Sequence, residues 1–427
     1  MFKSLTKEEK SWIFYDWANS AYTLTITSTI MGLYFLKSAT AAIPAVTANA
    51  YWGFGNTIAT IIVGLLAPIL GTIADYKGKK KMFFNFFLFM GLISTLTLAL
   101  VPSEFWWMLL AVYIVSAIGF SGANVFYDSF VVDVTEDKKM DWISSLGYGM
   151  GYIGSTIPFV LCMALVVFAE AYKTAFIVTA LWWLVFSIPI MKNVHQKYGI
   201  EPEYQYIRKS FKRIWSTLKE IKSHKPIFTF LIAYFLYADG VNTIIKMATT
   251  YGRTIGIGES SLLLILLATQ FVAFPFAIIY GKMANRFGTK RTIYFGIGTY
   301  CFICFIALFM SPDRDQATLT VMFWIVAMLV GTAQGGIQAL SRSYFGRIIP
   351  KEKANEFFGF YNIFGRFAAV MGTSLFGVIS LATGKPNYGI AGIIILFIAA
   401  GVVFRFVPDL FRQIKYSAPD ASKSHLC

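Results

Sequence analysis

Runs of apolar residues about as long as a bilayer is thick recur along almost the whole chain. A helix that crosses the hydrocarbon core needs roughly 20 mainly apolar residues. We expect twelve transmembrane helices, at residues 12–36, 51–74, 82–101, 105–132, 142–169, 174–191, 227–251, 261–283, 292–310, 319–340, 354–383 and 388–407. Strands of a membrane barrel would be about half as long and would alternate apolar with polar residues. The sequence therefore predicts an all-α membrane protein.

Composition and charge agree with this class. Hydrophobic residues make up 57% of the 427 residues and charged residues 14%, which is too little polar surface for a soluble globule. If both termini are cytoplasmic, 30 of the 37 Lys and Arg residues lie in cytoplasmic segments, Arg342 among them, and only Lys246 and Arg366 lie within the membrane. Because positive residues are retained on the cytoplasmic side, we expect a multi-pass protein of the cell inner (plasma) membrane.

The net charge of +15 is then explained by anionic lipids at the cytoplasmic face. No nucleic-acid partner is needed to account for it. The chain contains no phosphate-binding Gly-x-x-x-x-Gly-Lys pattern, and its histidines, His195, His224 and His425, fall in polar segments without metal-like spacing. We read Cys301-x-x-Cys304 as helix packing. We therefore expect no cofactor, no metal and no catalytic residues, so an enzyme is disfavoured.

The longest polar interruption, residues 192–226, divides the chain into an N-terminal six-helix bundle (1–191) and a C-terminal bundle with a cytoplasmic tail (227–427). Within this linker the apolar residues share one helical face, as in a helix that lies on the inner leaflet: Ile207, Phe211, Ile214, Trp215, Leu218 and Ile221. A basic amphipathic helix that binds a calmodulin-like partner would have the same pattern.

A short basic pattern occurs twice, after the second and the eighth predicted helix, with an offset of 210 residues. Its copies are Gly71-x-x-x-Asp75-x-x-Gly78-Lys79-Lys80 and Gly281-x-x-x-Asn285-Arg286-x-Gly288-x-Lys290-Arg291. Two further glycine pairs, Gly119 with Gly331 and Gly147 with Gly359, are each 212 residues apart. Equal spacing indicates a duplication, and a duplicated basic hairpin in a membrane chain suggests a transporter.

Twelve helices in two halves, a basic central linker and this hairpin resemble the major facilitator superfamily. Four motifs are more specifically similar to its "unknown major facilitator" branch, related to the autophagy-linked vacuolar amino-acid effluxers: residues 15–22, 237–240, 336–343 and 357–361. The chain departs from the branch at Val131-Val132-Asp133, where Leu-Pro is expected before the acid, and at Arg366, where a Lys is expected. The resemblance implies two six-helix bundles that rock around a site near the midplane.

The hairpins are candidate gates, as the resemblance also implies. Gly71 allows close helix packing, Asp75 is placed to cap a helix that starts near Ala354 in the other half, and Lys79 or Lys80 could pair with Asp133. The basic run could instead serve only as a topology signal. The full set of predicted gating residues is Gly71, Asp75, Gly78, Lys79, Lys80, Asp133, Gly281, Asn285, Gly288, Lys290 and Arg291.

Charged and amide side chains inside helices are costly in a bilayer, so they mark water-lined or paired positions. We expect Arg366 to hold a substrate carboxylate by a forked contact, and Asp239 or Asp128 to hold an ammonium group. An Asp239–Arg366 pair that only stiffens the bundle is the alternative. The predicted substrate-binding residues are Asp239, Arg366, Asn242, Gln334, Gln338 and Asn124. Asp16 and Asp128 are candidate proton carriers, with gating pairs as an equal alternative.

The function that fits these residues is a secondary transporter, a monomer, that exports amino acids or similar small zwitterions by alternating access, with proton coupling an open alternative. A rival of the same class exports lipids, drugs or other amphiphiles. A rival of another class is a membrane scaffold or sensor that does not transport. The expected partners are the small-molecule substrate, protons and anionic lipids.

Overall fold

The computed structural model describes residues 4–201, 216–217, 219–310, 314–368, 370–384 and 386–410. These residues are helical apart from short connections and an isolated bridge between Tyr76 and Ile200. Within the described residues, eleven helical stretches are long and apolar enough to cross a membrane. The first predicted span is also present, as an unbroken helical run of three shorter elements (Lys7–Ala39). The predicted all-α architecture is confirmed.

The N-terminal half contains α1 (Lys7–Tyr22), η1 (Thr23–Ile30), α2 (Met31–Ala39), α3 (Ala45–Ala74), α4 (Lys79–Leu98), α5 (Trp106–Ser129), α6 (Val131–Val134), α7 (Met140–Ala169) and α8 (Tyr172–Asn193). The element η1 is a π-helical segment rich in β-branched Thr and Ile, which crowd a regular α-helix. The Thr29 hydroxyl donates to the carbonyl of Leu24, five residues back, at 3.0 Å. π-helical segments inside longer helices often occur at functional sites.

The C-terminal half contains α10 (Lys225–Thr254), α11 (Glu259–Phe287), α12 (Thr289–Leu308), α13 (Gln316–Ile348), η2 (Lys351–Lys353), α14 (Ala354–Phe367), α15 (Val370–Thr383) and α16 (Pro386–Phe404). The eleventh predicted helix is therefore divided into α14 and α15. At Ala368 the backbone leaves the helical region, with φ −59° and ψ 142°.

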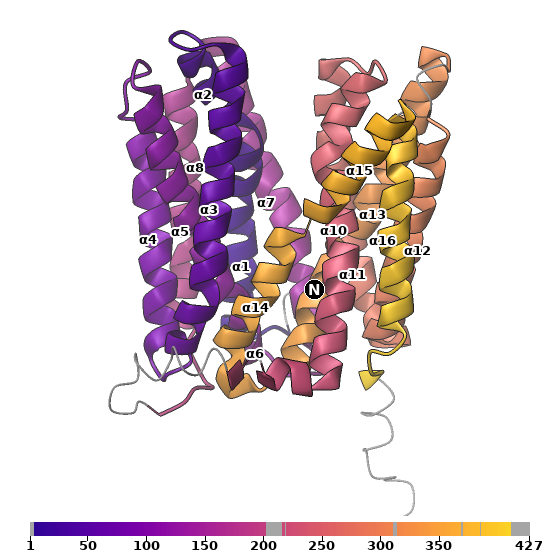
Figure 1. Cartoon of the computed structure of the whole chain (residues 1–427). Coiled ribbons are helices and arrows are strands. Elements are labelled where there is room, and N and C mark those ends of the chain that lie inside the picture. The colour runs from indigo at the N-terminus through magenta and orange to yellow at the C-terminus, as the bar shows by residue number, and fades with distance from the viewer. Residues whose placement is uncertain are drawn as a thin grey trace, which may run out of the picture.

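Most of the central linker, and with it most of the predicted amphipathic helix, lies outside the described residues. Its described part includes helical residues 216–217 and 219–223, and Lys353 on η2 donates to Glu220 at 2.7 Å. We call the end of the molecule where α8 ends and α10 begins the linker side, and the opposite end the far side. The two halves approach each other on the linker side and diverge toward the far side (Figure 1).

The duplicated pattern has the same two structural roles in both halves. Gly78 and Gly288 take positive φ angles of 80° and 92° between consecutive helices, a conformation that favours glycine. At Gly71 an added Cβ would lie 2.5 Å from the Asn355 carbonyl oxygen, and at Gly281 it would lie 2.8 Å from Cβ of Ser145. The first glycine of each copy thus lets its helix pack directly against the opposite half.

Candidate functional site

The interface between the halves is formed mainly by α3 packed on α14 and by α7 packed on α11 and α13. Both packings are closest on the linker side. Asp75, at the end of α3, lies at the first of them and is almost fully buried. Its Oδ1 accepts hydrogen bonds from the Asn355 backbone N–H (2.8 Å) and side-chain amide (3.0 Å), and its Oδ2 accepts one from the Glu356 N–H (3.3 Å).

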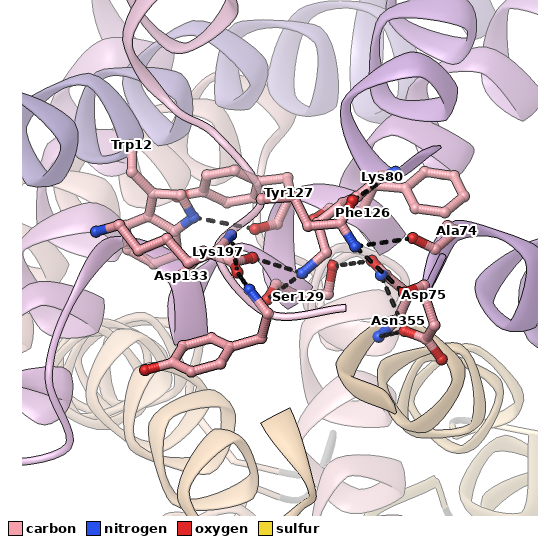
Figure 2. A network of polar contacts seen from close by, with 12 residues as sticks. Trp12, Ala74, Asp75, Lys80, Phe126, Tyr127, Ser129, Asp133, Lys197 and Asn355 are labelled. Atoms are coloured by element: carbon pink, nitrogen blue, oxygen red, sulfur yellow. Dashed lines mark hydrogen bonds and ion pairs between the residues drawn. The ribbon is translucent and has the colours of Figure 1, made fainter. Parts of the chain in front are cut away.

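Asn355 and Glu356 lie in the first turn of α14, where backbone N–H groups lack partners inside the helix and the helix dipole is positive. An acid from the N-terminal half therefore caps a helix of the C-terminal half. The contact predicted from the sequence between Asp75 and a helix that starts near Ala354 is present (Figure 2).

A second part of this network involves Lys80, on the first turn of α4, and Asp133, on α6. Their side chains are fully buried, and Lys80 Nζ lies 2.6 Å from Asp133 Oδ2. Of the two lysines considered, Lys80 therefore makes the pair. Lys80 Nζ also donates to the Ser129 carbonyl (3.3 Å), and the Ser129 hydroxyl donates to Asn355 Oδ1 (2.5 Å). The pair itself lies within the N-terminal half, but Ser129 connects it to the opposite half (Figure 2).

The start of the linker is attached to the same place. Asp133 Oδ1 accepts hydrogen bonds from the backbone N–H groups of Lys197 (2.8 Å) and Tyr198 (3.0 Å). The Ile200 N–H donates to the Asp75 carbonyl at 2.8 Å, and the Lys77 N–H donates to the Ile200 carbonyl at 3.0 Å. The first linker residues therefore fold back onto the hairpin between α3 and α4. Nothing in the sequence pattern predicted this attachment, because a short polar segment carries no periodic signal.

The second hairpin makes different contacts. Asn285 and Arg291 are exposed, and Lys290 Nζ donates to the Arg405 carbonyl at 2.9 Å, within its own half. The gating role of Asn285, Lys290 and Arg291 stays a prediction. Here the acid comes from the opposite helix: Asp141, in the first turn of α7, accepts hydrogen bonds from Thr289 (2.7 Å), Ser343 (2.5 Å) and Arg347 (2.5 Å).

The largest charged cluster of the interface is built around Arg342 of α13. Its Nη2 lies 3.1 Å from Asp16 Oδ2 and its Nη1 lies 3.1 Å from Asp128 Oδ1, while its Nε donates to the Ser144 hydroxyl at 3.0 Å. The guanidinium carbon also lies 4.5 Å from the ring centroids of Trp12 and Tyr148. One cation of the C-terminal half thus holds two acids, on α1 and α5, of the other half.

The predicted helix at residues 319–340 extends further in the structure and includes Arg342, which was expected in the cytoplasmic segment that follows it. The helix α13 continues to Ile348, and the Arg342 side chain is only 2% exposed. Asp16 and Asp128 are exposed to 11% and 17%. Both carboxylates attract the Arg342 guanidinium, so the cluster holds the two halves together by opposite charges.

The predicted Asp239–Arg366 pair is absent from the described part of the structure. Asp239 is fully buried on α10, and both its oxygens accept a hydrogen bond from the Gly372 N–H at 3.0 Å. Gly372 belongs to the first turn of α15, whose N–H groups are released by the break at Ala368. These backbone N–H groups bind the Asp239 carboxylate, so Asp239 stabilises the start of α15 in this conformation.

Arg366, on the last turn of α14, reaches across the interface instead. Its Nη1 donates to the Ser121 hydroxyl at 3.0 Å and its Nη2 donates to the Ser121 carbonyl at 3.1 Å. Ser121 lies on α5, and Asn124 and Asp128 follow it on the same helix. Asn124 Oδ1 accepts a hydrogen bond from Asn19 of α1 at 2.9 Å. The interface therefore carries a cation, amides and a carboxylate next to the Arg342 cluster.

The remaining candidate residues lie elsewhere in the C-terminal half. Asn242 donates to the Gly365 carbonyl at 3.2 Å, near the end of α14. Gln338 is partly buried on α13, one turn before Arg342. Gln334 lies one turn further back and borders a cavity within the C-terminal half. Of the six residues predicted to bind substrate, Arg366 and Asn124 make contacts on or from α5, which also carries Asp128, whereas Asp239 contacts α15 and Gln334 borders the cavity.

Two bundles related by a duplicated hairpin, with buried charges at their interface, define a transporter of the major facilitator superfamily. The fold matches the solved structure of the proton:xylose symporter XylE with a TM-score of 0.73 and 12% sequence identity, over 94% of this chain and 96% of that chain. It also matches a bacterial homologue of the iron transporter ferroportin, with a TM-score of 0.67 and 14% identity, over 96% and 98% of the chains. These two likenesses concern the fold alone.

The chain belongs to the family described as "Vacuole effluxer Atg22 like", whose model matches residues 41–139 and 132–413. It is 51% identical to the "Uncharacterized MFS-type transporter YxiO" of Bacillus subtilis over 96% of both chains. It is 26% identical to "Autophagy-related protein 22-1" of Aspergillus niger over 62% of this chain and 47% of that protein. The chain thus spans about half the length of this fungal relative.

Proposed function

We propose that this protein exports amino acids or similar small zwitterions, in exchange for protons, by alternating access. The observation that carries the proposal is the reach of Arg366 across the interface to Ser121, on the same helix as Asp128. A guanidinium offers a carboxylate a forked contact, and a carboxylate can receive an ammonium group. Export as the direction is supported by the family description of vacuole effluxers.

The gate of this transporter consists of the contacts of Asp75, Asp141 and Arg342 on the linker side. We place the linker side in the cytoplasm, because most of the Lys and Arg residues lie on that side. The conformation described here is then closed to the cytoplasm. We further place the protein in the cell's inner membrane, as a transporter rather than an enzyme.

Proton coupling would act through the Arg342 cluster. A proton that reaches Asp128, the more exposed of the two acids, neutralises one of the charges that attract Arg342. The free energy that favours the closed linker side then falls, and a change of a few kcal/mol is enough to shift the populations of two conformations. Release of that proton to the cytoplasm, together with zwitterion binding at Arg366, would return the substrate-loaded protein to the present conformation.

The test is counterflow in proteoliposomes with a panel of radiolabelled amino acids under imposed pH gradients. We expect uptake of at least one zwitterion that depends on the gradient. Arg366→Gln should abolish it, while Arg366→Lys, which keeps the charge and restores the residue typical of the branch, should retain part of it. Arg314→Gln, at an exposed position before α13, is the matched control and should leave flux unchanged.

Two other outcomes would replace the proposal. Silence for every zwitterion together with signal for amphiphiles would make the protein an amphiphile exporter. Silence for both classes, in protein that remains folded, would favour a scaffold or sensor. Zwitterion flux that Arg366→Gln leaves intact would remove this residue from the site without affecting the assignment as a transporter.

A further inference from the structure

A cavity lies inside the C-terminal half, apart from the interface between the halves. It has a volume of about 150 Å³, is partly open to solvent, and is bordered by α10, α11, α12, α13, α15 and α16. Its lining residues lie near the far-side ends of these helices, and Ile245 on α10, one of them, is 41% exposed. An engineered apolar cavity of about 150 Å³ binds benzene, so the enclosed space has room for a segment of a hydrocarbon chain, and its open side leaves room for the rest.

The walls of the cavity are almost entirely apolar. None of the described residues that line it is Asp, Glu, Lys, Arg or His, and the side chains include Leu266, Phe323, Val326 and Phe376. An ionised ligand would lose its hydration here without a compensating charge. The lining therefore favours an uncharged ligand with a mainly hydrocarbon body.

A polar side chain stands in this apolar wall with part of its hydrogen-bonding capacity unused. Gln334 of α13 is only 6% exposed, and its Nε2 has no hydrogen-bond partner among the described residues. A buried donor without an acceptor is costly. A ligand that brings an acceptor oxygen to this position would satisfy it. By contrast, the neighbouring Thr269 hydroxyl already donates to the Ile265 carbonyl at 2.7 Å.

The N-terminal half has close aromatic packing in its interior, so a cavity of this size is not a necessary feature of the fold. There the rings of Tyr22 and Phe120 stack with centroids 4.5 Å apart, and Trp183 lies 5.3 Å from Tyr22 and 5.7 Å from Phe120. Trp52 stacks on Tyr113 at 4.6 Å. An apolar cavity of this size lacks packing contacts that the other half has, unless a ligand supplies them.

We propose that the cavity binds an uncharged single-chain lipid, such as a monoacylglycerol, with part of its chain among the apolar residues and with its ester carbonyl as the acceptor of a hydrogen bond from Gln334. The site is separate from the zwitterion site proposed above, and its occupancy does not depend on that function.

The test uses the purified full-length protein in nanodiscs and a monoacylglycerol that carries a photoactivatable diazirine in its chain. After irradiation, labelled peptides are identified by mass spectrometry. We expect labels on the cavity-lining residues of α10 and α13, which excess unlabelled monoolein removes and excess free amino acid does not. A chain of the same length with a charged trimethylammonium head should label these peptides at least tenfold less.

Two variants test the recognition. Ala327→Trp fills the cavity and should abolish labelling there, whereas Ile325→Trp, at an exposed position of the same helix, should not. Gln334→Leu keeps the size of the side chain but removes the donor, and should raise the monoolein concentration needed for half-maximal competition by roughly tenfold. Melting temperature and elution volume confirm that each variant is folded.

The proposal is overturned if labels are spread over the lipid-facing surfaces and do not respond to Ala327→Trp, or if the charged lipid labels the cavity equally well. Unchanged competition in Gln334→Leu would remove the hydrogen bond from the proposal and leave a purely apolar site. Because labelling requires no transport, failure here is distinguishable from failure of amino-acid counterflow.

Discussion

The two halves share a fold and a duplicated hairpin, but they bring opposite charges to their interface. In the described part of the chain, four ion pairs cross between the halves, and in each the acid belongs to the N-terminal half and the cation to the C-terminal half: Asp16–Arg342, Asp128–Arg342, Asp141–Arg347 and Asp137–Lys351. The cap of α14 by Asp75 has the same polarity. Duplication thus accounts for the shared fold of the two halves, and later sequence divergence accounts for the opposite charges at their interface.

This division of charge indicates what holds the linker side closed. If each half carried both signs, pairs could form within a half and would contribute equally to every conformation. Pairs that cross the interface exist only while the halves touch, so their energy belongs to the closed conformation alone. The variants below break this arrangement, from the largest expected effect to the smallest.

Arg342→Met should have the largest effect. It leaves Asp16 and Asp128 buried beside each other without a cation, which we expect to cost about 3–5 kcal/mol of stability and to abolish transport. Thermal melting and counterflow measure the two consequences. The triple variant Arg342→Met, Asp16→Asn, Asp128→Asn removes the uncompensated charges and should recover most of the melting temperature without restoring transport. A triple variant that does not recover the melting temperature would contradict a charge-based role for Arg342.

Asp75→Asn should have a smaller effect, because the amide keeps one acceptor but loses the charge at the start of α14. We expect about 1 kcal/mol less stabilisation of the closed linker side, seen as faster amide hydrogen exchange in residues 354–359. Asn285→Ala, at the equivalent position of the second hairpin, should leave exchange unchanged because that side chain is exposed. Equal effects of both variants would mean that the hairpins act alike after all.

How far the sequence predicts this arrangement depends on the kind of signal each part carries. The helices follow from apolar runs and the Asp75 contact from a duplicated motif. The predicted helix at residues 319–340 ended before Arg342 because an arginine buried by the opposite half looks the same in sequence as one in a loop. The predicted Asp239–Arg366 pair was wrong because residues 354–383 contain no proline that would indicate a helix break. The backbone N–H groups at the start of α15, which bind Asp239, were therefore not predicted.

A charge swap at the rim of the interface should have a smaller effect again. Lys351 and Asp137 lie 2.9 Å apart with side chains 29% and 43% exposed. Partial burial of Lys351 opposes its charge, but the adjacent Asp137 carboxylate raises its pKa. Asp137→Lys should cost about 1 kcal/mol or less, and Lys351→Asp added to it should restore the melting temperature. The absence of such coupling in the double-mutant cycle would exclude this pair from the gate.

The smallest effect is expected from a pair that stays within one half. On the far side, Lys37 of α2 pairs with Glu170, which follows α7, and their side chains are 53% and 76% exposed. The hydrogen bond from Lys37 lowers the pKa of the Glu170 carboxyl. A lowered carboxyl pKa stabilises the fold above the unfolded-state pKa of about 4.3, and this contribution is lost as the pH falls through the folded-state value. Glu170→Gln should therefore make the melting temperature depend slightly less on pH across that acid range, and it should leave transport at neutral pH intact. A loss of transport comparable to that of Arg342→Met would show that pairs within a half also set the conformation, which the division of charge between the halves does not allow.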